Sequence, residues 1–545
     1  LKLSRSKASR ACQFCKFPAG PNAMALEERA GGDGDVELPH ADAAAEPRLD
    51  EAPECAALEP LSDRELLRRL SVVSLPVYPM CMVGRCVGLF STALVGHLND
   101  PNALAAVGLA NVITNVTGYS WLWGLSAAIS TNSSQAWGAK SYHAIGTTAQ
   151  RGFLILVCFA DVPLIVLWLL AEPFLVALNQ PPAVARLVGV YAKIRIPGIL
   201  CETVNAVVSR TLSSMGKTKV NLAISVVTMT ANIAFSVLLI PRYGFIGAPV
   251  ALLLCDAVQA MGICLLAWRD PDFRRCWPGL TRQAWKAWPA FLRISCPSLL
   301  LMGCEWWTWD LQNFLAGLVS PLAQATQAVA PRVTDLQYSV GQALSVGTST
   351  VIGNLLGEGN SAAAKRTAFL SMCLCLVLMV LQAAIFIALR SQFAHLFTTD
   401  ESIVRNIGEL LPLTLLFSFI DSHQATLTGI LVGVGKQAIA APICLFCYWI
   451  VGVPLGAALA FGAFGIEKQG LTGLWTGMLV GVILHTLLFG FIVAFLRWPL
   501  LAEAVRKRVE EERLQGISEC GNSGLDRSLV GGSSQGESRG AVCGD

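Results

Sequence analysis

Charged residues are scarce in this 545-residue chain, where Asp, Glu, Lys and Arg together make up only 14% of the sequence. Hydrophobic residues account for 54%, and the mean hydropathy is +0.56. Because a soluble protein of this size needs a more polar surface, the composition favours a chain folded in lipid. The net charge of only +3 lacks the basic excess typical of nucleic-acid-binding proteins, so we expect no nucleic-acid partner.

Motifs for enzymatic or metal chemistry are missing as well. The sequence has no His-Glu-x-x-His pair and no Asp-rich prenyl-diphosphate motif. Two Cys-x-x-Cys pairs, Cys12/Cys15 and Cys444/Cys447, have no second ligand pair at zinc spacing. Most of the 18 cysteines stand singly in apolar segments, where a free Cys is a small buried hydrophobe. We predict no enzyme, no metal site, no resident cofactor and no disulfide framework.

Long hydrophobic segments, by contrast, recur from Leu70 to Leu496. A helix needs roughly 20 mostly apolar residues to cross the hydrocarbon layer of a membrane. The sequence therefore predicts an all-α membrane protein with twelve transmembrane helices. They are placed at 70–98, 103–130, 152–170, 187–212, 220–240, 247–268, 289–318, 328–356, 367–389, 403–434, 438–461 and 470–496.

The two ends of the chain lack this apolar pattern. Residues 1–69 are predicted to be a disordered tail, and 498–545 a second tail that is rich in Gly and Ser beyond residue 514. The first 23 residues contain basic side chains and no acid. They are either an organelle-targeting segment or sequence upstream of a true start at Met24.

Basic residues gather at the ends of alternate spans. If the N-terminus is cytosolic, the cytosolic side carries Lys140, Arg151, Arg210, Lys217, Lys219, Arg269, Arg274, Arg275, Arg282, Lys286, Lys365, Arg366 and Lys436. The opposite side carries Arg186, Lys193, Arg195, Arg242, Arg390, Arg405 and Lys468. Because cytosolic loops are enriched in Lys and Arg, both tails are predicted to be cytosolic. The pattern does not choose between the plasma membrane and a vacuolar or other organelle membrane.

The chain contains an internal repeat. A shift of 219 residues aligns Gln135-Ala136-Trp137-Gly138 with Asn354-Leu355-Leu356-Gly357, and Gly216-Lys217 with Gly435-Lys436. Two separated matches at one offset indicate a duplicated unit of six helices. We place the two pseudo-symmetric bundles at 70–288, including a cytosolic linker, and at 289–497. An even number of spans in each repeat predicts an axis along the membrane normal, an arrangement that suits alternating access.

The motifs of both halves resemble the multidrug and toxic compound extrusion (MATE) family, and its eukaryotic branch in particular. The first half carries Leu94-Val95-Gly96-His97-Leu98 and Ser134-Gln135-Ala136-Trp137-Gly138-Ala139. The second carries Cys304-Glu305-Trp306-Trp307-Thr308-Trp309-Asp310, Ile352-Gly353-Asn354-Leu355-Leu356-Gly357-Glu358-Gly359-Asn360 and Gly433-Val434-Gly435-Lys436-Gln437. The resemblance covers roughly residues 70 to 497. It implies a monomeric secondary antiporter that exports organic cations or other amphipathic xenobiotics in exchange for protons or sodium.

Acidic side chains inside the predicted spans are the main candidates for the transport site. An ionisable group near the middle of a membrane costs about 3 kcal/mol, so it marks a functional position by default. Glu305 and Asp310 lie five residues apart in the seventh span, so they do not share one face of a straight helix. The resemblance implies a role in transport for Asp421 in the tenth span, and the 219-residue shift places Asp421 on Glu202. We assign all four acids to substrate or proton binding.

Aromatic and amide side chains complete the predicted site. Trp306, Trp307 and Trp309 follow the first acid of the seventh span, and a cation over an aromatic face gains about 0.5 to 2 kcal/mol. Three Trp residues within four positions cannot all face one way, so we assign Trp306 and Trp309 to the site. The amides that the repeat makes equivalent, Gln135 and Asn354, are assigned to it as well.

Other interpretations of these residues stay open. Glu202 could form an ion pair with Arg210 or Lys193 instead of binding a ligand. Lone ionisable residues inside spans are interpreted as structural partners; they are Arg85, Asp161, Asp256 and His485. At the level of function, a flippase for lipid-linked precursors is expected to have a strongly cationic cavity, whereas the second half carries acids. A receptor that transports nothing would leave the duplication unexplained.

Overall fold

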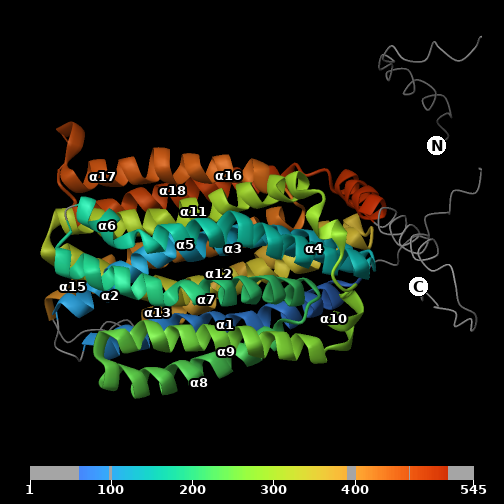
Figure 1. Cartoon of the computed structure of the whole chain (residues 1–545). Coiled ribbons are helices and arrows are strands. Elements are labelled where there is room, and N and C mark those ends of the chain that lie inside the picture. Colours follow the sequence, from blue (N-terminus) through green and yellow to red (C-terminus); the bar gives the residue numbers. More distant parts are fainter. Residues whose placement is uncertain (1–60, 97–100, 179, 389–400, 466, 513–545) are drawn as a thin grey trace, which may run out of the picture. The chain divides into compact units, whose positions relative to one another are not determined.

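The computed structural model describes residues 61–96, 101–178, 180–388, 401–465 and 467–512. Within these ranges the chain forms twelve long helical segments and no β-strand, and the helices lie side by side (Figure 1). The first half contains α1 (Asp63–Gly96), α2 (Pro101–Ile113) with η1 (Thr114–Tyr119) and α3 (Ser120–Gly138), α4 (Tyr142–Leu156) with η2 (Val157–Asp161) and α5 (Val162–Leu169), α7 (Pro182–Ser214), α8 (Thr218–Tyr243) and α9 (Gly247–Arg269). The second contains α11 (Trp288–Val319), α12 (Pro321–Gly357), α13 (Ser361–Ala388), α15 (Glu401–Gly433), α16 (Gln437–Leu445) with η5 (Phe446–Gly452) and α17 (Val453–Phe461), and α18 (Gly470–Ala494).

Short elements lie between these segments. They are α6 (Ala171–Ala177), η3 (Gly244–Ile246), α10 (Pro271–Cys276), η4 (Arg282–Trp285) and η6 (Ala463–Gly465). A further helix covers residues 498–512.

The predicted boundary of the first tail is wrong, because helix α1 begins at Asp63 rather than at residue 70. The segment assigned to the second tail begins with a helix, 498–512. Both helical segments are amphipathic and charged, so a search for purely apolar runs misses them. The predicted tail segments 1–60 and 513–545 lie outside the described residues.

Seven helical segments in the described ranges are long and apolar enough to cross a membrane. One of them, Thr218–Arg269, contains both α8 and α9. The α2–η1–α3 segment, α7, α11 and α12 are not among the seven. These four segments supply many of the polar contacts between and within the halves, as described below.

The helix boundaries confirm the internal repeat. Adding 219 to the ends of the α4–η2–α5 segment, residues 142 and 169, gives 361 and 388, which are the ends of α13. The same shift carries the ends of α7, residues 182 and 214, onto 401 and 433, the ends of α15. The turn after the fourth helix also repeats, because Gly216 and Gly435 both have a left-handed φ, of 77° and 76°. Such a conformation suits glycine, which has no Cβ.

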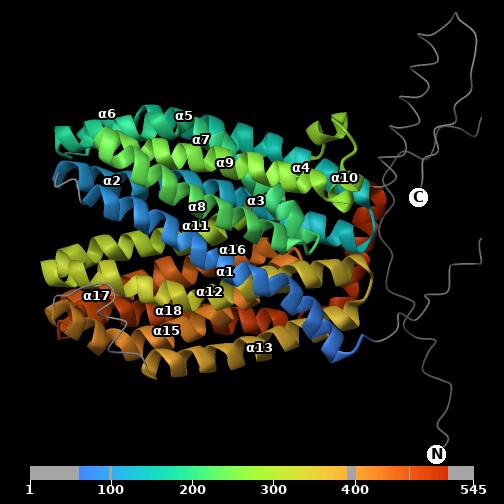
Figure 2. The same cartoon turned by 90° about the horizontal axis from the view of Figure 1, so that it is seen from below.

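The first helix of each half crosses to the other half. Helix α1 packs against α8 in its own half and against α12 and α13 in the second half (Figure 2). Its counterpart α11 packs against α16 in its own half and against α3 in the first half. The two crossings are equivalent under the repeat, so the halves are joined along both α1 and α11.

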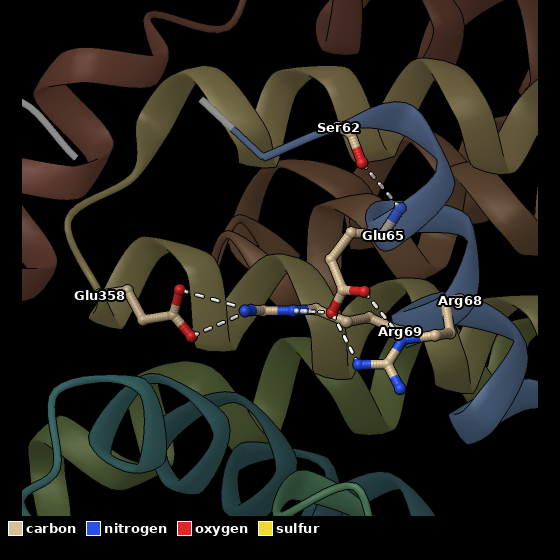
Figure 3. Close-up of polar contacts among 5 residues, drawn as sticks. All are labelled: Ser62, Glu65, Arg68, Arg69 and Glu358. Carbon is tan, nitrogen blue, oxygen red and sulfur yellow. Dashed lines mark hydrogen bonds and ion pairs between the residues drawn. The ribbon is translucent and has the colours of Figure 1, made fainter. Parts of the chain in front are cut away.

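We call the end of the bundle where α1 begins the tail end; it lies at the right of Figure 1 and also holds helix 498–512. Here Glu65 accepts hydrogen bonds from Arg68 at 2.8 Å and from Arg69 at 3.4 Å (Figure 3). Arg69 also reaches Glu358, after α12, at 3.2 Å. These pairs are partly exposed and each contributes little stability, about 0 to 1 kcal/mol. Of these three pairs, Arg69–Glu358 joins the start of α1 to the second half, and the other two lie within α1.

Candidate functional site

Glu305 and Asp310 face different partners from α11. Tyr338 on α12 donates its hydroxyl hydrogen to Oε1 of Glu305 over 3.2 Å, so Glu305 faces the interior of the second half. Asn115 in η1 donates from Nδ2 to Oδ2 of Asp310 over 3.5 Å, so Asp310 faces the first half. The expectation that the two acids occupy different faces of the helix is confirmed. Glu305 therefore takes part in packing within the second half, and Asp310 takes part in the contact between the two halves.

Asp421 on α15 joins Glu305 in a cluster of acids. Its side chain is buried, and its carboxylate interacts electrostatically with those of Glu305 and Asp335. Tyr448 in η5 lies beside the same group and interacts with both Asp421 and Glu305. The four residues, here called the acid cluster, come from α11, α12, α15 and η5. Because neighbouring carboxylates repel one another, this arrangement favours binding of a cation.

The tryptophans of α11 divide between the two halves. Trp307 donates from Nε1 to Oγ of Ser120 in α3 over 3.3 Å, so it faces the first half. Trp309 packs edge-on against Trp475 in the second half, with ring centroids 5.6 Å apart. Trp306 is half-buried. The sequence-based assignment thus left out Trp307, the indole that contacts the opposite half.

Glu202 lies in the first half with an indole as its partner. Trp123 donates from Nε1 to Oε1 of Glu202 over 3.1 Å. The Arg210 guanidinium lies over the Trp123 ring, 5.1 Å from the centroid, and donates to the Trp123 carbonyl oxygen over 3.1 Å. Lys193 pairs with Glu172 at 3.8 Å. Trp123 therefore occupies the place between Glu202 and Arg210 where the alternative ion pair was expected.

A buried ion pair lies close to Glu202. Nη1 of Arg195 is 2.5 Å from Oδ2 of Asp256, and the two side chains are only 5% and 12% exposed. Arg195 also donates to the hydroxyl of Tyr119 in η1. Tyr119, Arg195 and Glu202 line a small pocket with room for about one water molecule. Asp256 is thus a structural partner, as expected from its lone position in a span.

The placement of Arg195 corrects one inference about topology. It was counted among the basic residues at span ends, but α7 begins at Pro182, so Arg195 lies well inside a helix. Its position within an apolar segment was the signal that it needs a buried acidic partner. Tyr119 and Trp123 carried no such signal, because neutral aromatic residues are common in membrane spans.

Three π-helical segments in the described ranges supply polar residues to these clusters. Segment η1 supplies Asn115 and Tyr119, η2 supplies Asp161, and η5 supplies Tyr448. Thr203 donates to Oδ1 of Asp161 over 2.7 Å, which joins η2 to α7. A π-turn widens the helix locally and redirects side chains, and such segments are frequent at functional sites. Three of the polar contacts, Asp310–Asn115, Arg195–Tyr119 and Thr203–Asp161, therefore involve a residue in a π-helical turn.

Gln135 and Asn354 connect the two halves at the tail end. Gln135 donates from Nε2 to the carbonyl oxygen of Gly433, at the end of α15, over 2.8 Å. With its amide nitrogen turned toward its acceptors, Asn354 donates to the carbonyl oxygen of Ser214, at the end of α7, over 3.2 Å. Ser214 and Gly433 are themselves 219 residues apart, so the two contacts are equivalent under the repeat. The amides of Gln135 and Asn354 are thus occupied in joining the halves.

A second pair of equivalent hydrogen bonds lies beside these amides. Thr131 donates to the carbonyl oxygen of Val432 over 2.9 Å, and Thr350 donates to that of Ser213 over 3.3 Å. Together with the Gln135 and Asn354 contacts, these bonds form what we call the tail-end lock. The lock closes the bundle with the same set of bonds on both sides of the pseudo-twofold axis.

Sequence comparison places these features in a known family. The profile of the MatE family matches residues 80–238 and 297–458, one segment in each half. The chain belongs to the MATE family. Mouse "Multidrug and toxin extrusion protein 2" is 31% identical to this MATE chain over 459 residues, which cover 83% of the chain and 78% of the mouse protein. "Protein DETOXIFICATION 13" of Arabidopsis thaliana is 30% identical over 449 residues, with 81% of this chain and 92% of that protein covered.

Solved structures of MATE transporters share the fold. The crystal structure of the eukaryotic MATE transporter AtDTX14 matches with a TM-score of 0.76 at 25% identity, covering 82% of this chain and 99% of that one. An outward-facing multidrug resistance MATE transporter matches with a TM-score of 0.70 at 19% identity. The predicted fold of twelve transmembrane helices in two bundles is confirmed. This MATE protein is an integral membrane transporter and not an enzyme.

Substitution of a glycine beside the tail-end lock would test whether the lock is needed for transport. Gly138 and Gly357 both lie against it. A Cβ at Gly138 would lie 1.9 Å from the carbonyl oxygen of Asn354, and one at Gly357 would lie 2.0 Å from that of Gln135. Overpacking costs about 1 to 3 kcal/mol, so we expect Gly357→Ala to lower the transport rate in reconstituted vesicles by about 5- to 150-fold. The control is Gly490→Ala, where an added Cβ meets no atom within 4 Å. Equal rates for the two variants would show that this closure is not used.

Proposed function

We propose that this MATE transporter is an antiporter that exports organic cations or other amphipathic xenobiotics in exchange for protons, with sodium as the alternative coupling ion. The acid cluster around Glu305 and Asp421 is the observation that carries the proposal. The relatives named for multidrug and toxin extrusion support the substrate class. We further propose that the transporter works as a monomer in the plasma membrane or in a vacuolar or other organelle membrane.

Coupling follows from competition for the same carboxylates. Glu305 and Asp421 hold a cation when they are ionised, and protonation removes the charge that holds it. A proton that enters from the acidic side therefore releases the substrate cation, because one carboxylate cannot serve both ligands at once. The proton gradient supplies enough free energy for export, since a difference of one pH unit provides about 1.4 kcal/mol per proton. A membrane potential of 100 mV adds about 2.3 kcal/mol for each net charge moved.

Alternating access needs contacts between the halves that can be broken and remade. The Asn115–Asp310 and Ser120–Trp307 hydrogen bonds join the halves within the bundle, and the tail-end lock joins them at one end. Asp310 is the acid that can link cation binding to the contacts between the halves, since its partner Asn115 lies in the opposite half. We propose that protonation or cation binding at the acids of α11 alters these contacts and so biases which end is closed.

Uptake into sealed proteoliposomes tests the proposal. The purified transporter is reconstituted, and a fluorescent organic cation is followed under an imposed pH gradient, an imposed sodium gradient, or neither. We expect the pH gradient to drive accumulation and its collapse by an ionophore to stop it. Accumulation driven by sodium alone would assign sodium as the coupling ion. No accumulation of any organic cation under either gradient would contradict the proposed antiport.

A further inference from the structure

Helix 498–512 has one buried face. Trp498, Ala502, Val505 and Val509 are 5–6% exposed, and their spacing of four, three and four residues puts them on one side of a helix. These four side chains join the apolar cluster that contains Leu355 and its neighbours at the end of α12. The helix is therefore anchored to the second half by its apolar face.

The polar side of the same helix reaches the first half. Arg508 donates from Nη2 to Oε1 of Gln135, at the end of α3. The Glu512 carboxylate interacts electrostatically with Arg508 and with Arg151 on α4. A segment held by apolar contacts in one half thus makes charged contacts with the other half, across the tail end of the bundle.

Both polar atoms of the Gln135 amide are then in use. Its Nε2 donates to Gly433 of α15 as part of the tail-end lock, while its Oε1 accepts from Arg508. The Arg508 contact fixes which way the amide points, because a flipped amide would place two donors together. Arg508 therefore positions the donor that joins α3 to α15.

The repeat does not provide this contact twice. Asn354, the counterpart of Gln135, donates to carbonyl groups of Ser134, Ser214 and Thr350. The 219-residue shift places helix 498–512 on residues 279–293, which comprise the end of the linker and the first residues of α11. In this linker, Gly279 accepts a hydrogen bond at its carbonyl oxygen from Gln150 over 2.6 Å. The linker packs on α4 of its own half, so among the described residues the Gln135 side of the lock is the one that a helix from the other half contacts in this way.

We propose that helix 498–512 is a latch on the tail-end lock and that Arg508 is its positioning residue. The latch holds the lock closed through Gln135, and it must release Gln135 before the halves separate at the tail end. This inference rests on alternating access, which is part of the proposed function. It assigns the control of one closure to a segment that lies after the last transmembrane helix.

Hydrogen–deuterium exchange of the purified full-length protein tests the latch without requiring transport. In Arg508→Met we expect faster exchange in peptides that cover 131–138 and 430–436, by about tenfold, as for the loss of one hydrogen bond to a charged group. The matched control is Lys507→Met, since Lys507 is an exposed neighbour whose pairing is with Glu503 on the same helix. Arg508→Lys retains a donor and a charge and should restore most of the protection.

The outcomes separate the latch from a general effect on folding. Faster exchange confined to the lock peptides and reversed by Arg508→Lys supports the latch. Unchanged exchange in Arg508→Met overturns it, and so does an equal increase in peptides throughout the bundle. Because exchange is measured with neither a gradient nor a substrate, failure of the proposed antiport would leave this result intact. Failure of the latch would likewise leave the uptake assay unaffected.

Discussion

Glu305→Gln should abolish gradient-driven efflux while the protein remains folded and inserted in the membrane. Glutamine keeps the shape of the side chain and still accepts the hydrogen bond from Tyr338, but it neither binds nor releases a proton. The acid cluster then loses the group that is shared between proton and substrate. The measurement is efflux of an organic cation from proteoliposomes across a range of pH gradients, with protein amount and monodispersity checked by size-exclusion chromatography.

Two further variants sharpen the result for Glu305. Asp421→Asn should reduce gradient-driven efflux partially or fully, because Asp421 interacts with the Glu305 carboxylate. The matched control is Glu172→Gln, the same chemical change at a partly exposed acid whose pair with Lys193 contributes little. If Glu305→Gln transports at the wild-type rate with unchanged pH dependence, the coupling site lies at Asp421 or in the first half.

The largest loss of stability should follow removal of Asp256. Its ion pair with Arg195 is buried, and leaving one partner of such a pair uncompensated costs about 3 to 5 kcal/mol. We expect Asp256→Ala to lower the midpoint of thermal unfolding in detergent by several degrees or to prevent recovery of monodisperse protein. The double variant Arg195→Met/Asp256→Leu removes both charges and should recover much of the loss.

The exposed pair Lys193–Glu172 supplies the comparison for this experiment. Lys193→Met should leave the unfolding midpoint almost unchanged, because the paired atoms are 3.8 Å apart and the two side chains are 48% and 38% exposed. A double variant no more stable than Asp256→Ala would show that the charges do not act as a pair. An Asp256→Ala variant as stable as the wild type would show that Arg195 finds enough compensation in Tyr119 and Glu202.

Apolar length and the internal shift predicted most of the fold. Spans such as 220–240 and 367–389 are recognisable because lipid requires a long run of apolar side chains. Amphipathic helices are harder to recognise in the sequence than uniformly apolar ones. The start of α1 near Asp63 and helix 498–512 are both amphipathic, so their apolar residues recur at helical spacing without forming a run.

The acids of the site were recognisable one by one, but their partners were not. The membrane cost of a charge marks Glu305, Asp310 and Asp421 in the sequence alone. Which helix faces each acid depends on the rotation and crossing of the helices. Neither follows from spacing, so the contacts of Glu305 with Tyr338 and of Asp310 with Asn115 required the structure.

The π-helical segments have a consequence for how this sequence tolerates changes of length. A π-turn accommodates one extra residue in a helix, whereas an insertion or deletion elsewhere rotates everything that follows by about 100°. Loss of one residue within 114–119, 157–161 or 446–452 can therefore be absorbed locally, and the rest of the helix keeps its face. What such a deletion removes is the direction in which Asn115, Asp161 or Tyr448 points. Related chains that differ in length by one residue at these places should keep the scaffold and differ in which ions and solutes they recognise.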